Sequence, residues 1–195
     1  MINIVIFGAP GSGKGTYSAA IVEKFGFEHI STGSVLRAEI AAGSELGKIA
    51  QEYMNQGQLI PDELMIGILA KTYDSKKGSK GVIFDGFPRT IAQAEALQSM
   101  FKERGEEITA TLNLNVTEEE LLRRLLNRAT IEGRADDNEE TIKKRFEVYY
   151  KQTSPLIEWF NKLGVLYNFY YKGSKEIMIG EIIAKLDELC QNQTL

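Results

Sequence analysis

The chain has 195 residues, 43% hydrophobic and 26% charged, which are the proportions of a soluble globular protein long enough to bury a core. Its net charge of −4 argues against a protein that grips nucleic acid non-specifically. A single cysteine, Cys190, excludes an internal disulfide and a cysteine-rich zinc site. No run approaches the ~20 apolar residues of a membrane span, so we expect a cytoplasmic protein without nucleic-acid or membrane partners.

Short apolar runs alternate with helical patterns, which indicates βαβ units and an α/β fold with a parallel sheet flanked by helices. Five strands are expected, at Ile2–Phe7, Glu28–Ile30, Val82–Phe84, Ala110–Val116 and Val165–Tyr171. One helix follows the first strand and ends at Gly26. Further helices are expected from apolar faces, which comprise Leu46, Ile49, Ala50 and Tyr53, then Ile142, Phe146, Tyr149 and Tyr150, then Ile182, Ile183, Leu186 and Leu189.

Two segments, 31–60 and 128–136, have no obvious place in the sheet core, and we expect them to form mobile flaps. The core then comprises residues 1–30, 61–127 and 137–195. Within the last part, Thr153-Ser154-Pro155 is typical of a helix N-cap followed by proline in the first turn.

The strongest local motif is Gly8-Ala9-Pro10-Gly11-Ser12-Gly13-Lys14, which follows the first strand and opens a helix. This is the spacing of a phosphate-binding loop in its proper context, which disfavours a mere glycine-rich turn. The backbone N–H groups would surround an oxyanion, and Lys14 would reach the β and γ phosphates. Gly15 stands where most such loops carry a magnesium-binding Ser or Thr, so we expect Mg²⁺ to be held mainly by phosphates and water.

A companion carboxylate is expected at the end of another strand, and Asp85 follows Val82–Phe84. An aspartate at this position is often only a turn former or helix cap. Its continuation, Gly86-Phe87-Pro88-Arg89, favours a role in steering the metal through water.

The chain resembles the adenylate kinase family in segments that keep the family's order along nearly the whole chain. The matching segments are GAPGSGKGT at 8–16, ISTG at 30–33, DGFPRT at 85–90 with Gln93, and GRADDNEET at 133–141. The resemblance implies a P-loop NTPase-type fold in which 31–60 is a mobile NMP-binding segment and 128–136 a short lid. It also implies a monomer that carries out reversible, Mg²⁺-dependent, in-line transfer between ATP and AMP, giving two ADP, in adenine nucleotide homeostasis. Only 129–133 separate Arg128 from Arg134, so the longer, often zinc-bearing lid is absent and no zinc is expected.

The resemblance also implies roles for individual residues. Those expected to be catalytic are Lys14, Arg89, Arg124, Arg134 and Arg145. Those expected to contact ATP are Gly11, Ser12, Gly13, Lys14, Gly15, Thr16, Arg128 and, in the weakest part of the match, Gly173. Those expected to contact AMP are Thr32, Gly33, Arg37, Gln58, Leu59, Ile60, Gly86, Phe87, Pro88, Arg89, Gln93, Arg134 and Arg145. Asp136 and Asp137 are expected either to hold the lid's arginines or to cap the helix that follows.

The physical chemistry of the reaction agrees with an arginine cluster, because joining two polyanions requires positive charge that never titrates. Arg124 and Arg128 lie on one face of a predicted helix, and Arg134 is expected after a five-residue turn. The acceptor phosphate is already ionised at neutral pH, so the lone His29 is interpreted as structural. Lys143 and Lys144 are expected in exposed helix pairs with Glu139 and Glu140.

The sequence disfavours three alternatives. The first alternative is a uridylate/cytidylate kinase, which usually carries alanine at the position of Thr32 and asparagine at that of Thr90. The threonines found here, and the Gln93 amide, which can both donate to and accept from adenine, favour an adenylate kinase instead. A non-catalytic nucleotide sensor would have lost the lysine, the aspartate or the arginines, and none is lost. A GTPase-type switch would carry an Asn-Lys-x-Asp run, and the sequence has none.

Overall fold

A computed structural model describes residues 1–134 and 136–192, so that Ala135, in the predicted lid, lies outside the described residues. The described chain contains a five-stranded parallel sheet in the order β2-β3-β1-β4-β5, which confirms the predicted fold class. The strands are β1 (Ile2–Phe7), β2 (Glu28–Ser31), β3 (Gly81–Asp85), β4 (Ala110–Asn115) and β5 (Leu166–Tyr170). The central strand β1 is followed directly by the glycine-rich loop.

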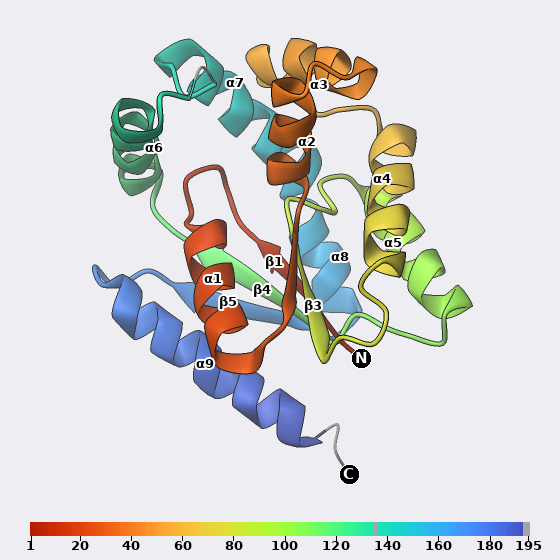
Figure 1. Ribbon diagram of the computed structural model, residues 1–195. Coiled ribbons are helices and arrows are strands. Elements are labelled where there is room, and N and C mark those ends of the chain that lie inside the picture. Colours follow the sequence, from red (N-terminus) through yellow and green to blue (C-terminus); the bar gives the residue numbers. More distant parts are fainter. Residues whose placement is uncertain (135, 193–195) are drawn as a thin grey trace.

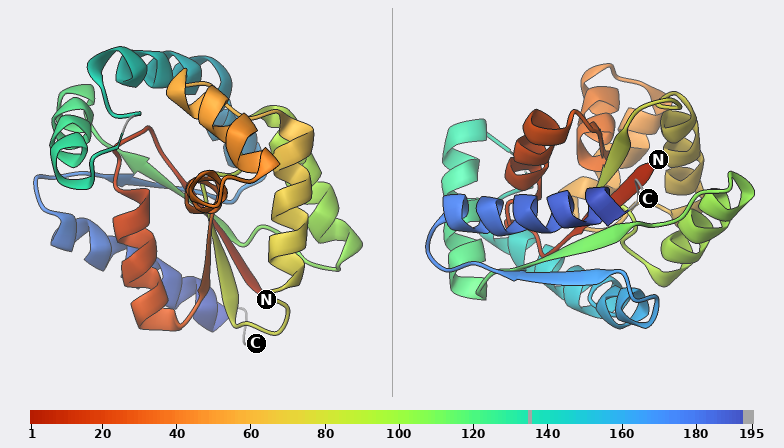
Figure 2. Two further views of the ribbon diagram at one scale, coloured as in Figure 1. Left: turned by 45° about the horizontal axis from the view of Figure 1, so that its top comes forward. Right: turned by 90° about the horizontal axis from the view of Figure 1, so that it is seen from below.

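Helices cover both faces of the sheet (Figures 1 and 2). The helical elements are α1 (Lys14–Phe25), α2 (Thr32–Ala41), α3 (Glu45–Asn55), α4 (Asp62–Asp74), α5 (Ile91–Glu103), α6 (Glu118–Glu132), α7 (Glu139–Val148), a π-helix (Tyr149–Thr153), α8 (Leu156–Lys162) and α9 (Lys175–Asn192). Because side chains alternate along a strand, Ile4 and Ile6 of β1 pack on α1 and α9, and Val5 and Phe7 face α4, α5 and α8. None of the described helices is long and apolar enough to cross a membrane.

Four helices lie beyond the end of the sheet at which the glycine-rich loop emerges (Figure 1). Helices α2 and α3 pack as a pair, and so tightly that a Cβ on Gly47 of α3 would lie 2.1 Å from the carbonyl oxygen of Glu39 in α2. Helices α6 and α7 form the second pair, joined by a small apolar cluster that includes Leu125 and Phe146. The pairs flank the carboxyl ends of the strands, where ligands bind in open α/β sheets.

Two local expectations about helices are wrong. Ile49 is 41% exposed, and the buried side of α3 is formed by Gly47 and Ala50, which lets α2 approach closely. The five-residue turn expected after Arg128 is helical, because α6 continues to Glu132 and ends at Gly133 with φ 62°.

The predicted N-cap at Thr153-Ser154-Pro155 is also wrong. The chain passes from α7 into the π-helix and then into α8, and no side chain caps α8. The Thr153 hydroxyl donates instead to the carbonyl oxygen of Arg89, at 2.8 Å. The change of helical pitch leaves Tyr150 50% exposed, although it was expected on the buried face.

Candidate active site

Two adjoining pockets open at the carboxyl ends of the strands. The side pocket is lined by the start of α2, the turn before α4 and the start of α5, including Thr32, Ile60 and Gln93. The loop pocket is lined by the glycine-rich loop, the start of α1 and part of α6. The two pockets share a set of lining residues, which are Pro10, Lys14, Gly33, Arg37, Arg89 and Arg145. Four cationic side chains therefore lie where the pockets meet.

The glycine-rich loop needs glycine for steric reasons. Gly11 has φ 84°, and a Cβ there would lie 2.9 Å from Leu125 of α6. Gly13 has φ 94° and forms the N-terminal boundary of α1 without a capping side chain. The first backbone N–H groups of α1 thus have no capping side-chain partner, which is the usual construction of an anion site at a helix N-terminus.

Lys14 is folded back over its own loop. Its Nζ donates to the carbonyl oxygens of Gly8, at 2.9 Å, and of Ala9, at 3.2 Å. Burial lowers the pKa of Lys14 to about 8. The charge of Asp85 raises this pKa, whereas the charges of Arg89 and Arg145 lower it further. An anion entering the pocket would therefore favour the charged form of this lysine.

Asp85 lies at the end of β3 with its Oδ2 3.4 Å from His29 Nε2. Burial alone would raise its pKa, but the hydrogen bond from His29 and the charge of Lys14 hold the pKa of Asp85 below its ordinary value. Sequence analysis interpreted His29 as structural and missed this contact. The pairing of β2 with β3 brings the two residues together, and no local sequence motif indicates it.

One carboxylate suits magnesium bound together with a nucleotide. In the described ranges, no group of three or more His, Cys, Asp or Glu side chains could hold a metal ion by itself. Mg²⁺ commonly uses one or two carboxylates together with substrate phosphates and water. Asp85, ionised and facing the loop pocket, fits that donor set.

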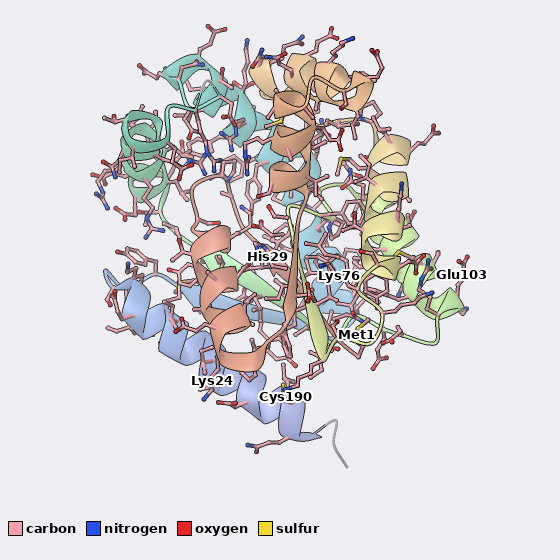
Figure 3. All side chains as sticks on the ribbon, in the orientation of Figure 1. Met1, Lys24, His29, Lys76, Glu103 and Cys190 are labelled. Atoms are coloured by element: carbon pink, nitrogen blue, oxygen red, sulfur yellow. The ribbon has the colours of Figure 1, made fainter. Side chains whose placement is uncertain are left out.

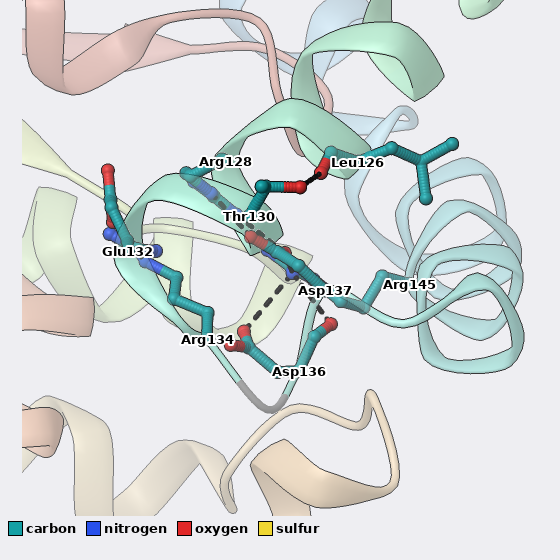
Figure 4. Close-up of polar contacts among 8 residues, drawn as sticks. All are labelled: Leu126, Arg128, Thr130, Glu132, Arg134, Asp136, Asp137 and Arg145. Carbon is teal, nitrogen blue, oxygen red and sulfur yellow. Dashed lines mark hydrogen bonds and ion pairs between the residues drawn. The ribbon is translucent and has the colours of Figure 1, made fainter.

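Acidic side chains hold the arginines above the loop (Figure 4). Arg128 of α6 makes two hydrogen bonds to Asp137, at 2.6 and 2.7 Å, and Arg145 of α7 donates to Asp137 at 2.7 Å and to Asp136 at 3.1 Å. Although burial of Asp137 acts the other way, these arginines hold its pKa below the ordinary value. Asn138 caps α7 by accepting from the Thr141 N–H, so the two aspartates do not serve as the cap.

The remaining predicted arginines also line the pockets. Arg124 donates to Glu120 at 2.8 Å and lies over the ring of Tyr171, 4.2 Å from its centroid. Arg134 donates to Glu132 at 2.6 Å. Burial and the charge of Arg145 lower the pKa of Arg89 from its usual value, although a guanidinium stays charged at neutral pH.

Polar side chains in the side pocket are already paired with protein groups. The buried amide of Gln93 accepts from the Arg89 N–H through Oε1, at 2.8 Å, and donates to Asp62 through Nε2, also at 2.8 Å. The Thr32 hydroxyl donates to the carbonyl oxygen of Gly86, at 3.0 Å. Asp62 was not among the predicted site residues.

Most predicted contact residues line one of the two pockets. Gly11, Gly13, Gly15, Thr16, Arg128 and Gly173 line the loop pocket, and Gln58, Leu59, Ile60, Gly86 and Pro88 line the side pocket. Two predicted contact residues line neither pocket. The Ser12 side chain is fully buried, with its Oγ lacking a hydrogen-bond partner, and Phe87 is packed in the core.

Comparison with known proteins agrees with this geometry. Residues 6–165 match the family model described as "Adenylate kinase". The chain is 61% identical to the adenylate kinase of Phocaeicola vulgatus and 60% identical to that of Bacteroides thetaiotaomicron, in each case over 97% of this chain and all of the relative. It is 51% identical to the adenylate kinase of Porphyromonas gingivalis over 90% of this chain and 91% of the relative. The chain belongs to the adenylate kinase family.

Membership in the adenylate kinase family confirms the resemblance found in the sequence. It makes the chain a phosphotransferase whose acceptor is a phosphate group, and it does not favour the uridylate/cytidylate alternative.

Lys143 and Lys144, expected outside the site, form exposed pairs with Glu139 and Glu140. Cys190 lies on α9, where it packs against the apolar cluster between that helix and the sheet (Figure 3).

Proposed function

We propose that the chain transfers the γ-phosphoryl group of ATP to AMP, reversibly and directly, where the two pockets meet. The observation that carries this proposal is the shared wall of the pockets, which contains Lys14, Arg37, Arg89 and Arg145. Two pockets that adjoin at four cationic side chains can bind two nucleotides with their phosphates close together, because the cations offset the repulsion between the phosphates.

In this proposal AMP occupies the side pocket and ATP the loop pocket. The base of AMP lies among Thr32, Gly33, Gln58, Leu59, Ile60, Gly86, Pro88 and Gln93, and its phosphate contacts Arg37 and Arg89. The phosphates of ATP lie on the backbone of 11–16 and on Lys14, with Arg128 and Gly173 toward the adenine. Arg124, Arg134 and Arg145 surround the group in transfer. Phe87 contributes by holding the 85–89 turn in the core.

The chemistry needs positioning and charge and no general base, because the attacking AMP phosphate is already ionised. Lys14 and the arginines stabilise the charge that spreads over the transferring oxygens. Mg²⁺ bound with ATP supplies further neutralisation of the phosphates, and Asp85 orients the water molecules around it. No covalent enzyme intermediate forms, and no zinc takes part.

Acidic side chains hold several of these arginines in the free protein. Phosphate oxygens would replace Asp136 and Asp137 beside Arg145, and Glu120 beside Arg124. We propose that segments 31–60 and 128–136 close over the nucleotides during this exchange and exclude water, which suppresses hydrolysis of ATP. We also propose that the chain acts as a monomer in the cytoplasm, without nucleic-acid or membrane partners. Its net negative charge supports the absence of a nucleic-acid partner.

The test is ADP formation from MgATP with AMP, UMP, CMP or GMP as acceptor, beside a reaction without acceptor. We expect strong preference for AMP and little ADP in the control. Preference for UMP or CMP would retain the phosphate chemistry and refute the assignment of Thr32, Thr90 and Gln93. Absence of transfer to every acceptor would refute the proposed function.

A further inference from the structure

Asp62 lies beside the side pocket without lining it. It is the first residue of α4, directly after Pro61, and its side chain is partly buried. Its Oδ1 accepts from Gln93 Nε2 at 2.8 Å, and its Oδ2 accepts from the Thr90 hydroxyl at 3.1 Å. Both carboxylate oxygens therefore bind side chains from the start of α5.

These bonds allow the Gln93 amide one orientation. Oε1 accepts the backbone N–H of Arg89, which can only donate, and Nε2 donates to the carboxylate of Asp62, which when ionised can only accept. Rotating the amide by 180° would place two donors together at Arg89 and two acceptors together at Asp62. Asp62 and the Arg89 N–H together thus fix which end of the amide is the donor.

The fixed amide retains one free acceptor position on Oε1 and one free N–H on Nε2. Because Gln93 lines the side pocket, a base in that pocket meets this donor and acceptor in a set order. An adenine edge pairs the N6 amino donor with a ring-nitrogen acceptor. Guanine carries a carbonyl oxygen, which accepts, where adenine carries that amino group, so it does not match the order that suits adenine.

We propose that Asp62 is a positioning residue for base selection, which makes the side pocket prefer AMP over GMP by locking the Gln93 amide. The inference rests on the proposed function and adds a residue to its acceptor site. It also gives Thr90, which lines neither pocket, a way to act on base preference, because its hydroxyl helps to hold Asp62. Selection then depends on a hydrogen-bond chain of Thr90, Asp62 and Gln93.

The test compares steady-state rates of Asp62→Ala with those of the unaltered protein, using MgATP with AMP or GMP. We expect KM for AMP to rise on the order of tenfold to a hundredfold, with a much smaller change in kcat and none in KM for ATP. The ratio of kcat/KM for AMP to that for GMP should fall by about tenfold, because only the Arg89 N–H then opposes rotation of the amide. An unchanged ratio would overturn the inference and leave the proposed function standing.

Control variants separate positioning from folding. Glu63→Ala removes the neighbouring, exposed carboxylate from the same first helical turn and should change neither KM nor the ratio. Asp62→Asn retains an oxygen that accepts from Gln93 Nε2 and should keep most of the selectivity. If Asp62→Ala does not fold, Asp62→Ser, which is too short to reach Gln93, replaces it with the same expected ratio.

A double-mutant cycle shows whether Asp62 acts through Gln93. In a Gln93→Ala background, Asp62→Ala should change the AMP-to-GMP ratio by less than about twofold, because the amide is already absent. Independent, additive effects would overturn the inference. Calorimetric titration of AMP and GMP without ATP gives the same ratio as binding constants. It therefore tests the role of Asp62 even if no phosphoryl transfer is observed. Absence of transfer would refute the proposed function and leave the role of Asp62 in base binding to be decided by the titration.

Discussion

The loop pocket and the side pocket use polar side chains in opposite ways. At the loop pocket and the junction, Arg128, Arg145 and Arg124 are paired with the carboxylates of Asp137, Asp136 and Glu120. At the side pocket, neutral groups such as Gln93 and Thr32 donate to or accept from groups that stay in place, including backbone atoms.

The difference follows from what each pocket has to bind. A phosphate can displace a carboxylate because both are anions that accept from guanidinium. In the proposed function the protein's own acids are therefore exchangeable partners, which neutralise the arginines until substrate arrives. A base is recognised by the order of donors and acceptors, so a side pocket that binds the base of AMP, as proposed, gains from an order set before binding.

The largest expected effect comes from removing a cation at the junction of the pockets. Arg89→Ala should lower kcat/KM for phosphoryl transfer by about a thousandfold or more, because no other group can replace its charge on the reacting phosphates. Steady-state rates, with circular dichroism to monitor the fold, measure this. Arg104→Ala is the matched control, since Arg104 pairs with Asp74 outside both pockets. Near-normal activity of the Arg89 variant would remove that residue from the site.

A smaller effect is expected from removing an exchangeable acid. Asp137→Ala leaves Arg128 without its carboxylate partner and Arg145 with Asp136 alone, so the free energy of unfolding should fall by about 2 to 4 kcal/mol. Saturating MgADP should raise Tm more in this variant than in the unaltered protein, because phosphates restore the missing partners. Thermal unfolding with and without MgADP measures both changes.

The control for Asp137 is Glu132→Ala, which breaks a more exposed pair with Arg134 and should cost less than about 1 kcal/mol. Equal ligand-induced shifts in the Asp137 variant and the unaltered protein would contradict the idea that phosphates take over from the acid.

The smallest expected effect is a dependence on pH. Burial lowers the pKa of Lys14 to about 8, so the free protein loses this charge as the pH rises above 8. Affinity for a non-hydrolysable ATP analogue should then fall by up to about tenfold per pH unit, because the bound state retains the proton. Titrations between pH 7 and 9.5 measure it, and Lys14→Arg, which stays charged, should show no such decline. A flat profile for the unaltered protein would contradict the prediction.

The lowered pKa of Lys14 also makes the free energy of unfolding depend on pH. The unfolded chain keeps Lys14 protonated up to its ordinary pKa of 10.5, so between pH 8 and 10.5 the unfolded state binds more protons than the folded state. The contribution of Lys14 to the free energy of unfolding therefore increases with pH across that window. Below pH 8 the cost of burying the charged form is fully present.

Sequence patterns predicted the structure correctly where it is determined by residues that are neighbours in the chain. The apolar run Ile2–Phe7 became β1 with the same bounds, and the glycine spacing placed Lys14 at the start of α1. The five parallel strands also followed from short buried runs separated by helices. These features could be predicted because strand and loop conformations depend on neighbouring residues, and a continuous apolar run is typical of a strand that is buried throughout.

Features that depend on distant contacts were not predictable in this way. The Asp62–Gln93 bond joins residues 31 positions apart, and the contact of His29 with Asp85 needs the pairing of two strands. The burial pattern of α3 depends on how closely α2 approaches, which explains the error at Ile49. The two roles left open for Asp136 and Asp137 could be separated only when Asn138 was seen to cap α7.

The close approach at Gly47 has a mechanical consequence. Because the backbones of α2 and α3 touch there, the two helices cannot slide or splay independently, and they form one stiff arm. In the closure proposed above, bending of the 31–60 segment therefore falls at the arm's two attachments, near Thr32–Gly33 and near Gln58–Ile60. Those attachments are themselves walls of the side pocket. In that proposal a molecule in the side pocket lies at the pivot of the arm, where a small displacement produces a larger movement at the tip.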